Sequence, residues 1–241
     1  MASGFTSTKE TTNYARLCRL LVGVGTQVLR ETFDKIHSPG RLHTVLTTAP
    51  VNATLTSMGR MRVINPTQWG TLMSPTVSSK EFDITLLVAL LRNICGLAAP
   101  TAAIWNIPPS PSDTTKEADI VRIRIHRNEV FAHVNSASVD DATFNTHWVS
   151  IMAPLVRLGG PSYQAIIDNL KTECMDPERE QYYQEQLKQW KEHDENVIEK
   201  LGEIKEKLDF STKSILQKMD EKLDISKQPV AHSVEDANVE G

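Results

Sequence analysis

Apolar residues recur at steps of three and four along much of the chain, which is the pattern of amphipathic helices. The pattern is clearest over residues 13–37, where it predicts one long helix that Ser38-Pro39-Gly40 ends. Two shorter helical patterns follow over residues 42–49 and 52–60. After them we predict a loop punctuated by prolines that carries Gln68-Trp69.

A stretch that is apolar nearly all round, over residues 82–97, predicts the central core helix, with Ser78 or Ser79 as its N-cap. The prolines between Pro100 and Pro111 then allow only an extended crossover. Three further helices are predicted, over residues 113–135, 138–160 and 162–175. Since no long alternating pattern of the kind that strands require is present, the predicted fold class is all-α.

Asp176-Pro177 marks the start of a different kind of helix, with Asp as N-cap and Pro in the first turn. Apolar residues then follow a heptad register from Tyr183 to Ile215, which is typical of a coiled coil. The alternative is a single helix that folds back on the globular part, because Tyr183 and Trp190 are bulky for a narrow seam. The predicted parts are a helical domain over residues 1–175, a long helix with coiled-coil character over 176–225, and a disordered tail over 226–241.

Charge divides the chain in the same way. Residues 1–175 carry 16 Lys and Arg against 13 Asp and Glu, whereas residues 176–225 carry 9 against 14. The formal net charge of −4 argues against a nucleic-acid binder held by overall positive charge alone. The three cysteines form no C-x-x-C pair, the amino terminus lacks the apolar core of a signal peptide, and the best apolar run, residues 84–91, is too short to span a bilayer. We therefore expect a cytoplasmic protein with no membrane contact.

Familiar catalytic motifs are absent from the sequence. It has no P-loop and no G-x-S-x-G elbow, and its seven His and three Cys never adopt zinc spacing, so we expect neither a metal nor a cofactor. What remains is Arg127-Asn128 followed by His133. Arg30 and His37 have a similar spacing, but Glu31 follows Arg30 and would repel a phosphate.

The residue types of this motif suit cleavage of a ribose-phosphate chain. An imidazole with a pKa near its reference value of about 6.5 can take the proton of a 2′-hydroxyl or protonate a leaving 5′-oxygen. A guanidinium can hold the phosphate through two hydrogen bonds, as lysine cannot. Asn128 could orient either the imidazole or the phosphate.

Helix geometry separates the two ends of the motif. Six residues place Arg127 and His133 about 120° apart around an ideal helix and about 9 Å apart along its axis. A second chain would have to complete a compact site, and His126, seven residues before His133, could face the same cleft. The alternative is that Arg127 is salt-bridged and His133 packed on a helix flank, with no chemical role.

The motif and its surroundings resemble the HEPN superfamily, whose RNase members use R-N-x-x-x-x-H. Three segments resemble the branch named for the DAZ-interacting zinc-finger ubiquitin ligase: FDITLLVALLRNIC (residues 82–95), EADIVRIRIHRNEVFAH (117–133) and LVRLGG (155–160). The resemblance covers roughly residues 10–190 and implies a HEPN-like helical bundle. His126 departs from it, since an aromatic residue such as Tyr is expected there.

Two functions follow from the resemblance. The first is a metal-independent endoribonuclease that forms a 2′,3′-cyclic phosphate at a composite dimer site, with RNA as partner and with Arg127, Asn128 and His133 as catalytic residues. The second is a non-catalytic homotypic scaffold in an innate-immunity-like or ubiquitin-ligase-related signalling protein. The homodimer would use both the HEPN domain and the C-terminal helix. Arg92-Asn93 and His126 are supporting candidates, although Arg92 could equally satisfy carbonyls at a helix end.

Overall fold

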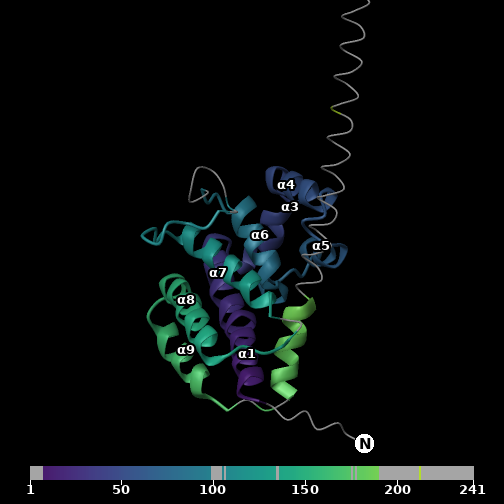
Figure 1. The fold of residues 1–241 in the computed structure, drawn as a ribbon. Coiled ribbons are helices and arrows are strands. Elements are labelled where there is room, and N and C mark those ends of the chain that lie inside the picture. Colours follow the sequence, from purple (N-terminus) through teal and green to yellow (C-terminus); the bar gives the residue numbers. More distant parts are fainter. Residues whose placement is uncertain are drawn as a thin grey trace, which may run out of the picture. The chain divides into compact units, whose positions relative to one another are not determined.

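The computed structural model describes residues 8–98, 105, 107–133, 136–174, 176, 178–189 and 212 of this chain, which form helices joined by turns and loops. Within those residues no strand is formed, which confirms the predicted all-α class. The α-helices of the bundle are α1 (Lys9–Arg19), α2 (Thr26–Ile36), α3 (Leu42–Thr47), α4 (Ala49–Arg60), α5 (Pro66–Met73), α6 (Ile84–Ile94), α7 (Lys116–Phe131), α8 (Asp141–Gly159) and α9 (Ser162–Thr172) (Figure 1).

The first predicted helix is observed as three consecutive segments. Between α1 and α2 the backbone passes through a π-helical segment, η1 (Leu20–Gly25). Thr8 caps the start of α1, where its side chain accepts a hydrogen bond from the Thr11 amide. A π-helical segment has more residues per turn than an α-helix, so it changes the face that the following residues present. Leu20 and Leu21 stay fully buried within it.

The predicted loop around Gln68-Trp69 is wrong, because the structure forms α5 there. Asn65 caps this helix, and its Oδ1 accepts from the Gln68 amide at 2.7 Å while Gln68 Oε1 accepts from the Asn65 amide at 3.1 Å. Pro66 occupies the first turn, where a missing N–H costs nothing. The proline therefore starts a helix instead of breaking one.

The N-cap of the core helix α6 also differs from the prediction. Asp83 caps it through a 2.7 Å hydrogen bond that its Oδ1 accepts from the Leu86 amide. Ser78 instead caps a short 3-10 helix, η3 (Ser79–Glu81), that precedes it. The Asp83 carboxylate also accepts from Gln68 Nε2 at 3.1 Å, so it links α5 to the start of α6.

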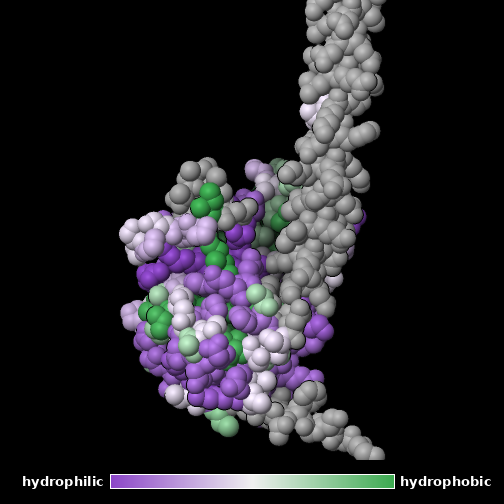
Figure 2. Space-filling view, viewed as in Figure 1, coloured by the Kyte–Doolittle hydropathy of each residue, from purple (hydrophilic) through white to green (hydrophobic). Residues whose placement is uncertain are grey.

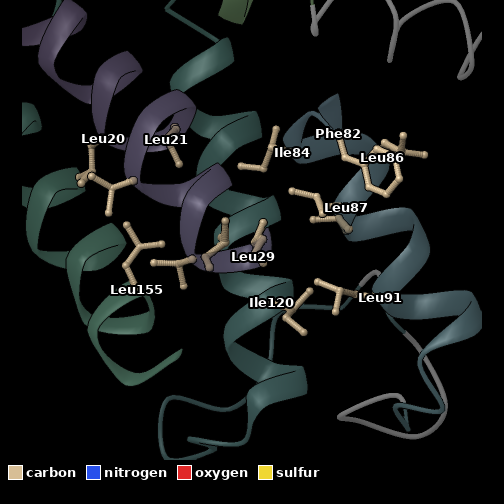
Figure 3. Packing of buried hydrophobic residues seen from close by; sticks show 14 of the residues in the cluster. Leu20, Leu21, Leu29, Phe82, Ile84, Leu86, Leu87, Leu91, Ile120 and Leu155 are labelled. Carbon is tan, nitrogen blue, oxygen red and sulfur yellow. The ribbon is translucent and has the colours of Figure 1, made fainter. Parts of the chain in front are cut away.

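The core lies where α2, α6, α7 and α8 meet (Figure 3). It confirms the apolar positions predicted for the first helix and for the central helix. The side chains of Leu29, Leu87, Ile120 and Leu155, one from each of these helices, have no exposed surface at all. Burial of each such side chain contributes about 1.5 to 3 kcal/mol, so this junction fixes the position of α7, which carries the motif.

Two glycines end α8 as predicted. A Cβ on Gly159 would lie 2.4 Å from the ring of Tyr163, so no larger residue fits against α9 at this point. Gly160 has a φ of 99°, a backbone conformation that glycine adopts without strain. The tight turn places α9 directly against α8.

Residues 178–189 form a further helix that belongs to the same compact unit as α1 to α9. Leu187 is fully buried within the hydrophobic core, and Glu180 Oε1 accepts from Thr12 Oγ1 at 3.1 Å. This part of the predicted heptad segment therefore packs on the bundle. The boundary at residue 175 and the coiled coil stay predictions, and the rest of that segment, apart from Thr212, and the predicted tail over 226–241 lie outside the described residues.

The visible face of the bundle is mostly hydrophilic, and its apolar residues form small separate patches (Figure 2). In the part of the chain that the structure describes, no helix has both the length and the apolar character that crossing a bilayer would require.

Candidate functional site at the end of helix α7

The predicted motif lies across the carboxyl end of α7. The helix begins after Thr115, whose side chain accepts from the Ala118 amide, and not at Asp113. It ends at Phe131, with Ala132 as C-cap, four residues before the predicted end at 135. His133 therefore lies in the turn after the helix, where its amide donates to the Val130 carbonyl at 3.1 Å.

The guanidinium of Arg127 is held inside the chain. Only 4% of this residue is exposed, and its Nη1 donates to Thr85 Oγ1 of α6 at 2.8 Å. Its Nε and Nη2 donate to Asn128 Oδ1 at 3.2 and 3.0 Å. Asn128 is itself exposed, so its amide covers one edge of the guanidinium. In the structure Asn128 thus orients the arginine, a role that differs from the two predicted from the sequence, namely orienting the imidazole or the phosphate.

The imidazole of His133 faces a second imidazole. Its ring centroid lies 6.0 Å from that of His147 on α8, and the two planes meet at 73°. Both residues are half-buried, so part of each ring is open to solvent. The two helices α7 and α8 pack along each other and bring these rings together.

Glu129 joins a third imidazole to this pair. Its Oε2 lies 2.7 Å from His126 Nδ1 and 3.8 Å from His147 Nδ1. The surroundings lower the pKa of His147 below its usual value, because burial disfavours the charged ring, and the nearby His133 and His126 add to this while Glu129 opposes it. His147 therefore favours its neutral form at neutral pH. We call His126, Glu129, His133 and His147 the histidine cluster.

The side chains of the cluster are of kinds that can exchange protons. Across the described part of the chain, no set of three or more His, Cys, Asp and Glu side chains has the arrangement that a bound metal ion needs. A neutral imidazole can accept a proton and a charged one can donate it. The cluster thus offers imidazoles at the same end of α7 as Arg127, whose guanidinium faces α6 instead.

The opposite end of α7 is held by a buried ion network. The carboxylate of Asp119 is 1% exposed and accepts from Arg157 Nε at 2.8 Å and Nη2 at 2.5 Å. Arg122 Nη1 donates to the same carboxylate at 2.8 Å. Because Arg157 belongs to α8, this network fixes α7 against α8.

The supporting candidates Arg92 and Asn93 have other partners. The Arg92 guanidinium lies over the ring of Trp105, 5.6 Å from its centroid, and burial followed by the charge of Arg124 lowers its pKa. Asn93 Nδ2 donates to the Ala89 carbonyl of its own helix at 2.7 Å. Arg92 is two helical turns from Thr85, which is the α6 residue that contacts Arg127. Their roles in a site stay predictions.

The similarly spaced pair, Arg30 and His37, has structural partners. Arg30 Nε donates to the Ser79 carbonyl at 2.8 Å, and His37 Nε2 lies 3.2 Å from the Ile94 carbonyl. The His37 ring also packs on Phe33, with centroids 5.3 Å apart. This pair provides matched controls for the motif.

Three residues of the site were not found from the sequence. Thr85 and His147 come from other helices, and their proximity depends on packing that no spacing rule describes. Glu129 had a local signal, because it lies three residues after His126 and the two side chains share a helical face.

Comparisons with known proteins match most of this bundle. The family model described as DZIP3/hRUL138-like HEPN matches residues 39–183, which is more than half of the chain. Human E3 ubiquitin-protein ligase DZIP3 is 28% identical over 163 residues, covering 66% of this chain and 13% of that protein. Mouse E3 ubiquitin-protein ligase DZIP3 is 27% identical over 151 residues, covering 61% of this chain and 12% of that protein. No solved structure gives a significant match.

Proposed function

Because this chain belongs to the DZIP3/hRUL138-like HEPN family, we propose that it binds RNA and cleaves it without a metal, at a site built from two copies of the chain. Arg127 holds the scissile phosphate, Asn128 orients Arg127, and His133 transfers protons. The supporting observation is the combination of a fixed guanidinium and a half-buried imidazole at one helix end.

Phosphate binding requires Arg127 to exchange an acceptor. In the free chain the guanidinium donates to two neutral oxygens, Thr85 Oγ1 and Asn128 Oδ1. A hydrogen bond to a phosphate oxygen is charge-assisted and roughly twice as strong as a neutral one. Since Asn128 is exposed, rotation of its side chain would open the guanidinium edge that faces solvent.

The composite site follows from the separate environments of the two ends of the motif. Arg127 faces α6 through Thr85, whereas His133 lies past the helix end and faces His147 of α8. A second copy of the same helix end would add a guanidinium and further imidazoles to one cleft. A two-fold contact between α7 ends satisfies this, because the same surface then meets itself.

The test is cleavage of 5′-labelled single-stranded RNA by the full chain in EDTA, combined with light scattering. The wild-type chain should be a dimer and should leave 2′,3′-cyclic phosphate ends. His133→Ala should lower the rate about 10²-fold or more, because proton transfer is lost. His37→Ala, a half-buried histidine outside the motif, should leave the rate unchanged. Full activity of a folded His133→Ala chain, or a strictly monomeric wild-type chain, would contradict the proposal.

A second function is supported by the burial of Arg127. With 4% exposure and acceptors inside the chain, this arginine already has the partners of a structural residue. The chain would then be a homotypic scaffold, as part of a ubiquitin-ligase-related protein. The chain spans only 13% and 12% of the two ligases, so their activity is not transferred to it. A dimeric wild-type chain that cleaves no RNA in the same assay would favour this function.

A further inference from the structure

The histidine cluster contains more proton-transfer groups than the motif requires. His133 is the one imidazole that the motif supplies, yet the ring of His147 lies 6.0 Å from it, centroid to centroid. Both rings are half-buried at the same end of the α7 and α8 pair. Cleavage that forms a cyclic phosphate needs two proton transfers, one at each side of the phosphorus.

The Glu129 carboxylate lies on one edge of the His147 ring. Its Oε2 lies 3.8 Å from His147 Nδ1, so the carboxylate faces that edge of the ring. Nε2 is on the other edge of an imidazole and remains for a substrate. At 3.8 Å the contact is electrostatic and not a hydrogen bond, since the same oxygen is hydrogen-bonded to His126 Nδ1 at 2.7 Å.

We propose that His147 is a second catalytic residue, which acts with His133 as the acid-base pair of the cleavage reaction. This inference rests on the proposed function and adds to it a residue outside the motif. The neutral form that its surroundings favour suits the role of base, which leaves the role of acid to His133.

The reaction balances with these two groups alone. His147 Nε2 accepts the proton of the ribose 2′-hydroxyl, and the 2′-oxygen forms a bond to phosphorus. The bond from phosphorus to the 5′-oxygen breaks, and protonated His133 donates its proton to that oxygen. The products are a 2′,3′-cyclic phosphate and a 5′-hydroxyl. One proton has moved from His133 to the leaving group and one from the substrate to His147, so exchange with water restores both rings.

A substrate with sulfur in place of the bridging 5′-oxygen separates the two roles. A thiolate leaves without protonation because its conjugate acid is far stronger than an alcohol, so the general acid is no longer needed. The full-length chain is compared as wild type, His133→Gln, His147→Gln and the control His37→Gln, on ordinary RNA and on the sulfur-containing RNA. Thermal melts confirm folding, and His147→Asn serves as a second variant if the Gln substitution unfolds the chain.

We expect both cluster variants to lose about 10²-fold or more on ordinary RNA, while His37→Gln matches wild type. On the sulfur substrate His133→Gln should recover to nearly the wild-type rate, whereas His147→Gln should stay about 10²-fold slower. The recovery of His133→Gln identifies the general acid. The equal loss of His147→Gln on both substrates is that of a general base, and the thermal melts separate it from a loss of fold.

Two results would overturn the inference while leaving the proposed function intact. The first is a folded His147→Gln chain that cleaves ordinary RNA within about threefold of wild type, against the loss of about 10²-fold that removal of a general base produces. The second is recovery of His147→Gln to nearly the wild-type rate on the sulfur substrate, because a general base is needed whatever the leaving group is. If wild type cleaves neither substrate, the proposed function itself fails, and the role of His147 fails with it.

Discussion

The two ends of α7 carry charged side chains in opposite arrangements. Near its start, one buried carboxylate, Asp119, is matched by two guanidiniums, from Arg122 and Arg157. At its end, one exposed carboxylate, Glu129, lies within 4 Å of two imidazoles, with a third imidazole beside them. In the first set the single carboxylate is hydrogen-bonded to both guanidiniums. In the second set three imidazoles lie near a single carboxylate.

The difference shows two kinds of charged group in one helix: those that hold the fold together and those proposed to transfer protons. A buried carboxylate is costly unless it is paired, so Asp119 and its arginines must stay together in the folded chain. An imidazole is the side chain that can gain or lose a proton near neutral pH, and three of them lie at the other end. The same helix is therefore anchored at one end and carries the proposed proton-transfer groups at the other.

The largest expected effect belongs to the anchored end. Asp119→Ala leaves two guanidiniums without their carboxylate, and removal of one partner of a buried pair costs about 3 to 5 kcal/mol. Because Arg157 is partly exposed, we expect about 3 kcal/mol in urea unfolding. Asp168→Ala, at an exposed carboxylate on α9, should cost less than about 0.5 kcal/mol. An equal loss of unfolding free energy in Asp119→Ala and Asp168→Ala would show that the ion network does not anchor the start of α7.

The second effect is expected at Arg127, which is buried in the fold and is also the proposed phosphate-binding residue. Arg127→Lys keeps a positive charge but cannot keep the bonds to Thr85 and Asn128 in one plane. We expect RNA cleavage to fall about 10²-fold, which is about 2.7 kcal/mol in transition-state stabilisation. Stability should fall by about 1 kcal/mol. A rate unchanged from wild type would assign this residue to the fold alone.

The smallest effect is expected at Glu129. Its carboxylate raises the pKa of His147 against burial, so Glu129→Gln should lower that pKa further, by less than about one unit for a charge at an exposed position. NMR titration of the histidine Hε1 signals measures the change. The charges facing His147 that must be followed together are Glu129, His133 and His126. An upward shift of the pKa would contradict the arrangement of the cluster.

The sequence predicted the parts of the fold that depend on local pattern. Apolar periodicity located the buried positions of α2, α6 and α8. The helix predicted over residues 138–160 is observed as α8, capped by Asp140, which accepts from two amides. Proline was misread at Pro66, since the same residue can end a helix or occupy its first turn.

The site was predictable only along one helix. Arg127 and His133 are close in sequence, and a motif of fixed spacing identifies both. Thr85 and His147 are brought to them by packing of α6 and α8, and tertiary contacts of this kind leave no periodic signal. Spacing also assumed a helix through His133, whereas α7 ends at Phe131.

The burial of Arg127 has a consequence for reading genetic variation in this chain. A missense change there alters how much folded protein a cell keeps as well as what each molecule does, because a loss of 1 to 2 kcal/mol can change abundance several-fold. His133 and His147 are less buried than Arg127, so changes at their rings have less packing to lose. A mutational scan that records abundance and function in separate channels would therefore distinguish the imidazoles from the guanidinium, although all three belong to one proposed site.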